Sequence, residues 1–264
     1  MNYKKVKLKP KKEESLKRFH PWIFSGAVQS KDESLAEGEV VNVYTINDEF
    51  IAVGHYQIGS IEVRVLSFEE EDIDLDFWKK RLSSALELRK SIGLLSDNNN
   101  SYRLVHGEGD LLPGLIIDVY AETAVIQSHS VGMHESRLMI CDALKAVLGD
   151  NLKNVYYKSN LGAENEYLDK GDSVNEIALE NGLKFYPDWV KGQKTGFFVD
   201  QRDNRALLEK YSKGRSVLNM FCYTGGFSFY ALRGGANLVH SVDSSSKAIM
   251  LTNRNVGLNF PDDK

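Results

Sequence analysis

Residues 217–243 read VLNMFCYTGGFSFYALRGGANLVHSVD, in which two apolar runs flank a glycine-rich turn. The first run, at 217–221, is suited to a buried parallel strand. A helical stretch follows the Gly225-Gly226 turn, and LVHSVD at 238–243 forms the second run. SSSKAIMLTNRNVGLN then opens with serines, which cap helices well. The order strand, helix, strand, helix predicts the start of a doubly wound, Rossmann-like α/β fold.

The turn and the end of the second strand have the features of an adenosine-binding site. Glycine allows positive φ, so the backbone can approach a ligand closely. The amides at the start of the following helix point toward whatever occupies the turn. Asp243 ends the second strand, where a carboxylate can accept hydrogen bonds from both ribose hydroxyls. The alternative is a tight turn and an aspartate that only caps a helix.

Two cofactor classes compete for such a site. A dinucleotide enzyme is expected to carry GxGxxG, so that the pyrophosphate sits on the helix N-terminus. Here Gly226 is followed by Phe227-Ser228-Phe229, and such bulky residues disfavour a pyrophosphate. S-adenosylmethionine has no phosphate, and methyl transfer from it needs mainly proximity and orientation. The sequence therefore favours a methyltransferase over an oxidoreductase.

The remaining chain divides by pattern into two further regions. Residues 1–70 alternate in strand fashion and predict a small β-barrel. Residues 77–190 mix helical and strand patterns around a tight-turn signal at Asn181-Gly182, and predict an α+β domain. With 191–264 as the first part of the α/β domain, the expected fold is multi-domain, with boundaries at 1–70, 77–190 and 191–264.

Composition limits the class of protein. The chain has 264 residues, of which 42% are hydrophobic and 27% charged, as in ordinary globular proteins. No apolar run approaches membrane-spanning length, and the N-terminus lacks a secretory apolar core, so a cytoplasmic protein without membrane contact is expected. Two cysteines, Cys141 and Cys222, form no CxxC pair. This argues against a disulfide framework or a zinc site, and no metal is expected.

The net charge of −4 hides an uneven distribution. Residues 1–18 carry eight lysines and arginines against two glutamates, which is +6 locally and leaves −10 for the rest. A basic edge on an acidic body can bind phosphates. Equally, these lysines can protect a solvated edge strand from aggregation.

Four segments resemble one known family, in the same order along the chain. They are HPWIFSGAV (20–28), RLVHGEGDLLPGLIIDVY (103–120), GQKTGFFVDQRDNR (192–205) and VLNMFCYTGGFSFYALRGGANLVHSVDSSSKAI (217–249). They are similar to the bacterial ribosomal RNA large-subunit methyltransferases that make 5-methylcytosine. The resemblance covers nearly the whole chain. It implies a PUA RNA-binding domain, a middle domain and a class I S-adenosylmethionine-dependent methyltransferase domain, with ribosomal RNA as partner.

The resemblance also implies the site residues. The cofactor would be held by residues of the last two segments, namely Phe197, Asp200, Gln201, Arg202, Asn219, Tyr223, Thr224, Gly225, Gly226 and Asp243. RNA would be bound through Lys9, Lys17 and Arg18 on phosphates and through His20 and Trp22 on unpaired bases. Taken without the resemblance, Trp22 and Phe24 are better interpreted as core residues.

The chain departs from the family pattern in one respect. Methylation at cytosine C5 needs a cysteine thiolate that adds to C6, and the family carries this cysteine and an Asp-Pro-Pro motif beyond the second Rossmann helix. Neither motif is in this sequence, so no catalytic residue is assigned, and Cys222 is interpreted as lining the cofactor turn. Two strands cannot bury their helices. We therefore expect a C-terminally truncated chain that is inactive alone, and a homodimer stays open.

Two alternatives to cytosine methylation stay open as well. One is a non-catalytic RNA-binding protein with a vestigial cofactor fold. The other is guanine-N7 methylation on the same scaffold.

Overall fold

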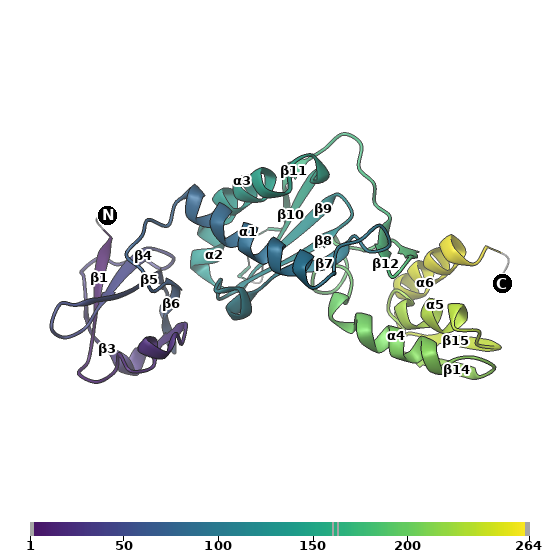
Figure 1. Ribbon diagram of the computed structural model, residues 1–264, viewed down its shortest axis with the longest axis horizontal. Coiled ribbons are helices and arrows are strands. Elements are labelled where there is room, and N and C mark those ends of the chain that lie inside the picture. Colours follow the sequence, from purple (N-terminus) through teal and green to yellow (C-terminus); the bar gives the residue numbers. More distant parts are fainter. Residues whose placement is uncertain (1–2, 160, 163, 262–264) are drawn as a thin grey trace. The chain divides into compact units, whose positions relative to one another are not determined.

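The computed structural model describes residues 3–159, 161–162 and 164–261 (Figure 1). Contacts divide the chain into two compact units, each built from several segments. The first unit holds 1–89, 104–117 and 126–170, and the second holds 90–103, 118–125 and 171–264. The three-domain boundaries expected from the sequence stay a prediction.

A six-stranded sheet forms the N-terminal part of the first unit, with the strand order β2-β6-β5-β4-β1-β3. Neighbours pair antiparallel except β1 and β4, which are parallel. Alternate side chains such as Val6, Leu8, Val41, Val43 and Val63 are buried in a common core. The strands are β1 (Lys4–Leu8), β2 (Trp22–Phe24), β3 (Val28–Lys31), β4 (Val40–Tyr44), β5 (Phe50–Tyr56) and β6 (Ile61–Ser67). The short 3-10 helix η1 (Leu16–Arg18) lies between β1 and β2.

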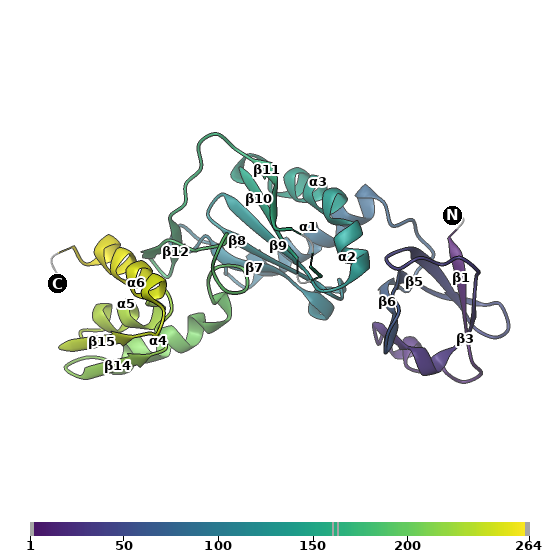
Figure 2. The same cartoon turned by 180° about the vertical axis from the view of Figure 1, so that it is seen from behind.

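A five-stranded sheet with the order β11-β10-β9-β8-β7 follows along the chain. Its strands are β7 (Ser101–His106), β8 (Leu115–Tyr120), β9 (Thr123–Ser128), β10 (Asn154–Ser159) and β11 (Glu166–Lys170). Three helices accompany them, α1 (Leu75–Ser91), α2 (Val131–Glu135) and α3 (Arg137–Leu148). Helix α1 lies in front of the sheet in Figure 1 and behind it in Figure 2, so it covers one face.

The tight turn predicted at Asn181-Gly182 is confirmed. It joins β12 (Ala178–Glu180) to β13 (Leu183–Phe185) in an antiparallel hairpin. Asn181 and Gly182 have φ angles of 49° and 80°. Two successive positive φ values characterise the type I′ turn, which matches the twist of the strands it connects.

The C-terminal part of the second unit has the predicted order of strand, helix, strand and helix. Its elements are β14 (Ser216–Met220), α5 (Gly226–Arg233), β15 (Leu238–Val242) and α6 (Ser246–Asn259), preceded by η5 (Val199–Gln201) and α4 (Arg202–Tyr211). The two strands pair in parallel. The expectation of a buried strand is wrong, since Leu218 and Met220 are 62% and 50% exposed. The reason is that β14 pairs only with β15 among the described residues.

Across the ranges that the structure describes, no helix combines the length and apolar character needed to span a bilayer.

Helix α2 packs closely against β5 within the first unit. A Cβ at Gly132 would lie 2.1 Å from His55 Cγ, so only glycine allows this approach. The buried His55 ring stacks on Trp78 with 6.4 Å between centroids, and its Nε2 lies 3.3 Å from Ser136 Oγ. Burial, together with the nearby positive charge of Arg64, lowers the pKa of His55 to about 4.

This burial predicts a pH-dependent stability. Because the pKa of His55 falls from 6.5 unfolded to about 4 folded, the unfolded chain binds the extra proton first as pH falls. The free energy of unfolding should therefore be unaffected by His55 above pH 6.5 and fall by about 3 kcal/mol between pH 6.5 and 4. Urea titrations across this range measure the slope. The neutral variant His55→Gln should lose the part of the pH dependence that His55 contributes. The control His106→Gln, at an exposed position, should keep the pH dependence of the wild type. Equal slopes in all three proteins would contradict the attribution of this pH dependence to His55.

Candidate functional site

The turn after β14 has an unusual backbone conformation, with three positive φ angles, and contacts from neighbouring elements stabilise it. Phe221, Tyr223 and Gly225 have φ angles of 59°, 50° and 80°. At Gly225 a Cβ would lie 2.7 Å from Thr252 Cγ2, so a side chain does not fit. Helix α6 anchors the turn, because Thr252 Oγ1 donates to the Tyr223 carbonyl at 3.0 Å. Asn255 Nδ2 adds a second bond, to the Thr224 carbonyl at 2.9 Å.

Asp243 connects this turn to the end of β15. Its two carboxylate oxygens accept one backbone amide each, from Ser245 and from Tyr223, both at 2.9 Å. These two hydrogen bonds lower the pKa of Asp243, so it is ionised at neutral pH. A carboxylate offers about four acceptor positions, and the two amides use one on each oxygen. The partly exposed carboxylate keeps acceptor capacity for a pair of neighbouring hydroxyls, which fits the ribose of S-adenosylmethionine.

Asn219 lies on β14 near the same turn. Its Nδ2 donates to Ser228 Oγ at 2.8 Å, and that hydroxyl lies 2.6 Å from Ser241 Oγ. These contacts link β14, α5 and β15 and fix the orientation of the Asn219 amide. Together with Tyr223, Thr224, Gly225, Gly226 and Asp243, the structure brings six of the ten expected cofactor residues to one place.

The loop at 192–198 packs against the same turn through Tyr223. The Tyr223 hydroxyl donates to the Gly196 carbonyl at 3.2 Å and accepts the Gln193 amide at 3.0 Å. At Gly192 a Cβ would lie 2.2 Å from the Asp188 carbonyl oxygen and 2.5 Å from the Tyr223 hydroxyl, so glycine is required there as well. The loop and the turn are therefore one assembly.

A buried carboxylate holds this loop from the other side. Asp118 on β8 is fully buried and accepts two hydrogen bonds from Arg103, at 2.8 and 3.0 Å. It also accepts a hydrogen bond from Thr195 Oγ1. Tyr120 donates to the Phe197 carbonyl at 3.1 Å. The sequence reasoning missed Asp118 and Thr195, although both lie in the segments that carry the family resemblance.

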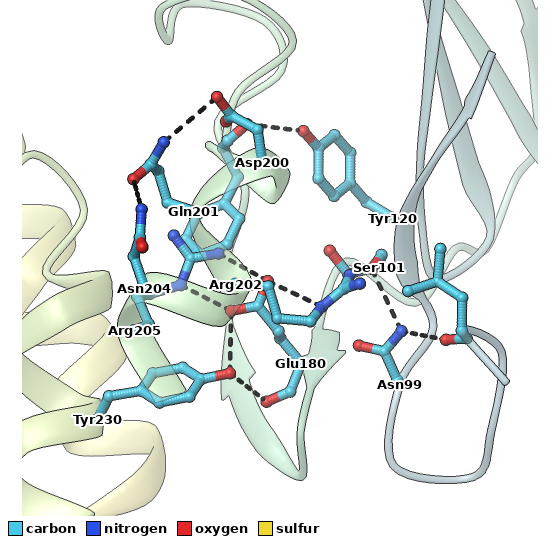
Figure 3. A network of polar contacts seen from close by, with 12 residues as sticks. Asn99, Ser101, Tyr120, Glu180, Asp200, Gln201, Arg202, Asn204, Arg205 and Tyr230 are labelled. Carbon is cyan, nitrogen blue, oxygen red and sulfur yellow. Dashed lines mark hydrogen bonds and ion pairs between the residues drawn. The ribbon is translucent and has the colours of Figure 1, made fainter. Parts of the chain in front are cut away.

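A second buried network joins β12, α4 and α5 (Figure 3). Arg205 forms two hydrogen bonds of 2.7 Å with Glu180, and Tyr230 donates to Glu180 at 3.0 Å (Figure 3). Arg202 donates to the Ser101 carbonyl and lies 3.5 Å from the same carboxylate. Burial, with the Glu180 charge beside it, raises the pKa of Tyr230, which keeps the hydroxyl protonated as a donor.

Four of the expected cofactor residues belong to this network or its edge. Phe197 is buried, with its ring stacked 3.9 Å from that of Phe185 and 4.5 Å from the Arg205 guanidinium. Arg202 is held by the contacts just described. Asp200 is exposed and accepts a 3.4 Å hydrogen bond from Gln201. Phe197 and Arg202 are thus engaged with buried neighbours, while Asp200 and Gln201 keep their polar groups near the surface.

The expected RNA-binding residues lie in the first unit and are partly engaged within it. Lys9 Nζ donates to the Gly26 carbonyl at 2.9 Å, and Lys17 pairs with Glu14 at 3.0 Å. Trp22 Nε1 donates to Glu108 at 2.9 Å. Arg18 and His20 are exposed. The interpretation of Phe24 as a core residue is wrong, since it is 49% exposed, and Trp22 is half-buried.

Neither cysteine is an activated nucleophile. Burial raises the pKa of Cys222, whose Sγ lies 3.6 Å from Thr252 Oγ1. Burial also raises the pKa of Cys141, to about 11. Both thiols are therefore protonated at neutral pH. The described residues also include no group of three or more His, Cys, Asp or Glu side chains able to hold a metal ion.

The site has the three features of a Rossmann-like nucleoside-cofactor site. They are a glycine turn after a parallel strand, a helix that begins in that turn, and a carboxylate at the end of the next strand. Comparison with known families narrows this class. Residues 111–262 match the S-adenosylmethionine-dependent methyltransferase family, and residues 6–68 match a PUA-like domain. The chain belongs to the S-adenosylmethionine-dependent methyltransferase family. The expectations of this cofactor and of a PUA-like N-terminal domain are thereby confirmed.

Individual relatives of the chain are also methyltransferases by name. The chain is 39% identical to ribosomal RNA large subunit methyltransferase I of Pseudoalteromonas atlantica and 38% identical to that of Aeromonas hydrophila. These matches cover 97% and 94% of this chain but 66% and 65% of the relatives, so it spans slightly less than two thirds of their length.

Solved structures are similar over the same range. A SAM-dependent methyltransferase from Streptococcus mutans matches with a TM-score of 0.81 and 26% identity, over 97% of this chain and 67% of that one. A methyltransferase structure in complex with SAH gives a TM-score of 0.82, also at 26% identity, over 97% of this chain and 66% of that one.

The Glu180 network predicts a large loss of stability on neutralising one partner. In Glu180→Gln the buried Arg205 keeps its charge without a counter-ion, which costs about 3 kcal/mol. Glu209→Gln is the matched control, because Glu209 binds Arg233 with the same two-bond geometry at 2.6 and 2.7 Å on the surface; its loss should stay below about 1 kcal/mol. Native-state hydrogen exchange at the α5 amides measures the loss of stability in each variant. Equal effects would contradict the importance given to burial.

Proposed function

We propose that this chain forms the RNA-binding and cofactor-binding parts of an enzyme that methylates large-subunit ribosomal RNA at cytosine C5. The observation that carries the cofactor part is Asp243, ionised and partly exposed at the end of β15 beside the turn at Gly225. The substrate is supported by the two bacterial relatives, whose name is ribosomal RNA large subunit methyltransferase I.

The residues of the turn would bind and orient the cofactor. Asp243 would accept hydrogen bonds from the two ribose hydroxyls. The amides at the start of α5 and the side chain of Asn219 would face its amino-acid end. When bound, S-adenosylmethionine supplies an electrophilic methyl group with a good leaving group. The protein's contribution is then position and orientation, which a turn fixed by Thr252, Asn255 and Tyr223 provides.

The RNA would be bound through the basic N-terminal segment. Arg18 and Lys12 are exposed, and neither pairs with a carboxylate among the described residues. Such cations bind phosphates without reading sequence. Lys17 would have to exchange its contact with Glu14 for a phosphate.

Cytosine C5 methylation also requires a thiolate that adds to C6 and leaves again with the C5 proton removed. The raised pKa values of Cys141 and Cys222 and the burial of both disqualify them for this step. The proposal therefore assigns the nucleophile to neither of these two cysteines.

The modified base can be identified in the cell. Ribosomal RNA from a strain that lacks the gene should have lost one 5-methylcytosine of the large subunit, and complementation should restore it. Mass spectrometry of nuclease fragments measures the change. Loss of a 7-methylguanine instead would reject the cytosine assignment and keep the methyltransferase, while unchanged modification would reject both.

The role of Asp243 predicts a specific effect on cofactor affinity. Asp243→Asn removes the charge from the ribose contact, and charge-assisted hydrogen bonds to hydroxyls are worth about 1.5–3 kcal/mol. S-adenosylmethionine binding should therefore weaken roughly ten- to hundredfold. Calorimetric titration measures it, with Asp203→Asn on the exposed side of α4 as the control that should bind like the wild type. Unchanged affinity in Asp243→Asn would remove the carboxylate from the site.

A further inference from the structure

Positive charge gathers in the second unit, in two stretches of chain that pack together. Residues 183–198 and 246–259 carry five cations against one carboxylate, which is +4 locally on a chain whose net charge is −4. The first stretch holds β13 and the loop after it, and the second is helix α6. We call the two stretches the basic strip. Its carboxylate is Asp188, and its cations are Lys184, Lys191, Lys194, Lys247 and Arg254.

Direct contacts hold the two stretches of the basic strip against each other. The side-chain amide of Asn259 on α6 accepts the Lys184 backbone amide at 2.8 Å and donates to the Lys184 carbonyl at 2.7 Å. One and a half turns earlier on the helix, the Arg254 guanidinium lies over the Tyr186 ring, 3.4 Å from its centroid. Cations from both stretches therefore belong to one continuous surface.

The single carboxylate of the basic strip is already engaged. One oxygen of Asp188 accepts the Lys191 backbone amide at 3.0 Å, and the other forms an ion pair with Lys247. The side chains of Lys184, Lys191 and Lys194 are exposed and pair with no carboxylate among the described residues. Their charge is therefore available to an anion from outside the chain.

The backbone on both sides of Lys194 is tied to the cofactor turn. The Tyr223 hydroxyl accepts the Gln193 amide at 3.0 Å and donates to the Gly196 carbonyl at 3.2 Å. Lys194 itself has a φ of 48°, in a region that residues other than glycine seldom adopt. Its ammonium lies 4.6 Å from the centroid of the Phe198 ring. The fold thus places this cation beside the turn before any ligand binds.

One buried side chain also connects the other end of the basic strip with the turn. Asn255 on α6 donates through Nδ2 to the Thr224 carbonyl at 2.9 Å, and its Oδ1 accepts the Tyr186 amide at 2.8 Å. An anion bound on the strip would therefore lie next to the turn that is proposed to orient the cofactor. A polyanion with one part that must reach the methyl group complements this arrangement of charge.

We propose that the basic strip binds the phosphate backbone of the RNA next to the nucleotide that is methylated. Lys184, Lys191 and Lys194 pair with phosphate oxygens, and Arg254, whose guanidinium lies flat on a tyrosine ring, contacts a further phosphate. Such contacts position a strand and read no sequence. The inference rests on the proposed RNA substrate. It adds a second contact surface, in the cofactor-binding part of the chain and apart from the N-terminal segment.

A double variant tests the strip against a matched change of charge. Lys191→Gln/Lys194→Gln removes two cations of the strip, and Lys210→Gln/Lys213→Gln removes two exposed cations at and beyond the end of α4, outside the strip. Anisotropy of a short fluorescein-labelled single-stranded RNA of mixed sequence measures binding from about 50 to 200 mM KCl.

The strip variant should bind this RNA about tenfold more weakly than the wild type. The slope of log affinity against log salt should fall by about 1.4 units, because each phosphate contact to a single strand contributes about 0.7. The α4 variant should keep the wild-type affinity and slope. Arg254→Gln should lower the slope by about 0.7, whereas Arg254→Lys, which keeps the charge and loses the planar stack, should leave it unchanged.

The outcomes separate this inference from the proposed function. Wild-type binding to RNA with an unchanged slope in Lys191→Gln/Lys194→Gln overturns the basic strip and leaves the RNA substrate standing. Equal losses in the strip and α4 variants also overturn it, because net charge alone would then explain both. No binding of RNA by the wild type at low salt overturns the RNA substrate itself. Cosedimentation with phosphatidylserine vesicles that only the strip variant loses assigns the strip to a membrane surface and overturns the proposal.

Discussion

The backbone amide of Tyr223 donates to the carboxylate of Asp243, and this bond ties the end of β14 to the end of β15. Parallel strands bring their carboxyl ends to the same edge, but nothing in the ladder orients the residues beyond it. The Asp243 carboxylate does so, because its other oxygen accepts the Ser245 amide at the start of α6. One ionised side chain therefore connects the turn to the start of the next helix, and it is the group that we propose as the partner of the cofactor ribose.

The sequence predicts contacts between residues that are close along the chain, and it misses contacts between residues that are far apart. The Gly225-Gly226 turn, the serine cap of α6 and the Asn181-Gly182 hairpin are local, and the residue types alone predict them. Asp118 and Thr195 are 77 residues apart, and no periodicity pairs them. Glu180 and Arg205 are buried together although each alone would be expected at the surface. Such pairs follow from tertiary packing, which the pattern of a single sequence does not contain.

The same distinction explains the N-terminal residues. Charge alone predicted a basic edge, and the lysines are there, but their neighbours decide what each can do. Lys17 is close to two glutamates and Lys9 donates to a backbone carbonyl, whereas Lys12 is exposed and pairs with no carboxylate among the described residues. Phe24 was expected in the core because it is apolar, yet its strand places it on the open side. Successive side chains on a strand point to opposite faces, so the position on the strand, and not apolar character alone, decides whether such a residue is buried.

The conformation of the turn shows why so many contacts converge on it. Phe221 and Tyr223 have positive φ without being glycine, which costs on the order of 1 kcal/mol or more at each position. Hydrogen bonds from Thr252 and Asn255 and the contacts of the Tyr223 hydroxyl offset this cost. A turn of low intrinsic stability is thus held from α6 on one side and from the 192–198 loop on the other. The orientation of Asp243 is consequently fixed by the fold itself, and a group that is oriented in advance reduces the entropy lost when a ligand binds.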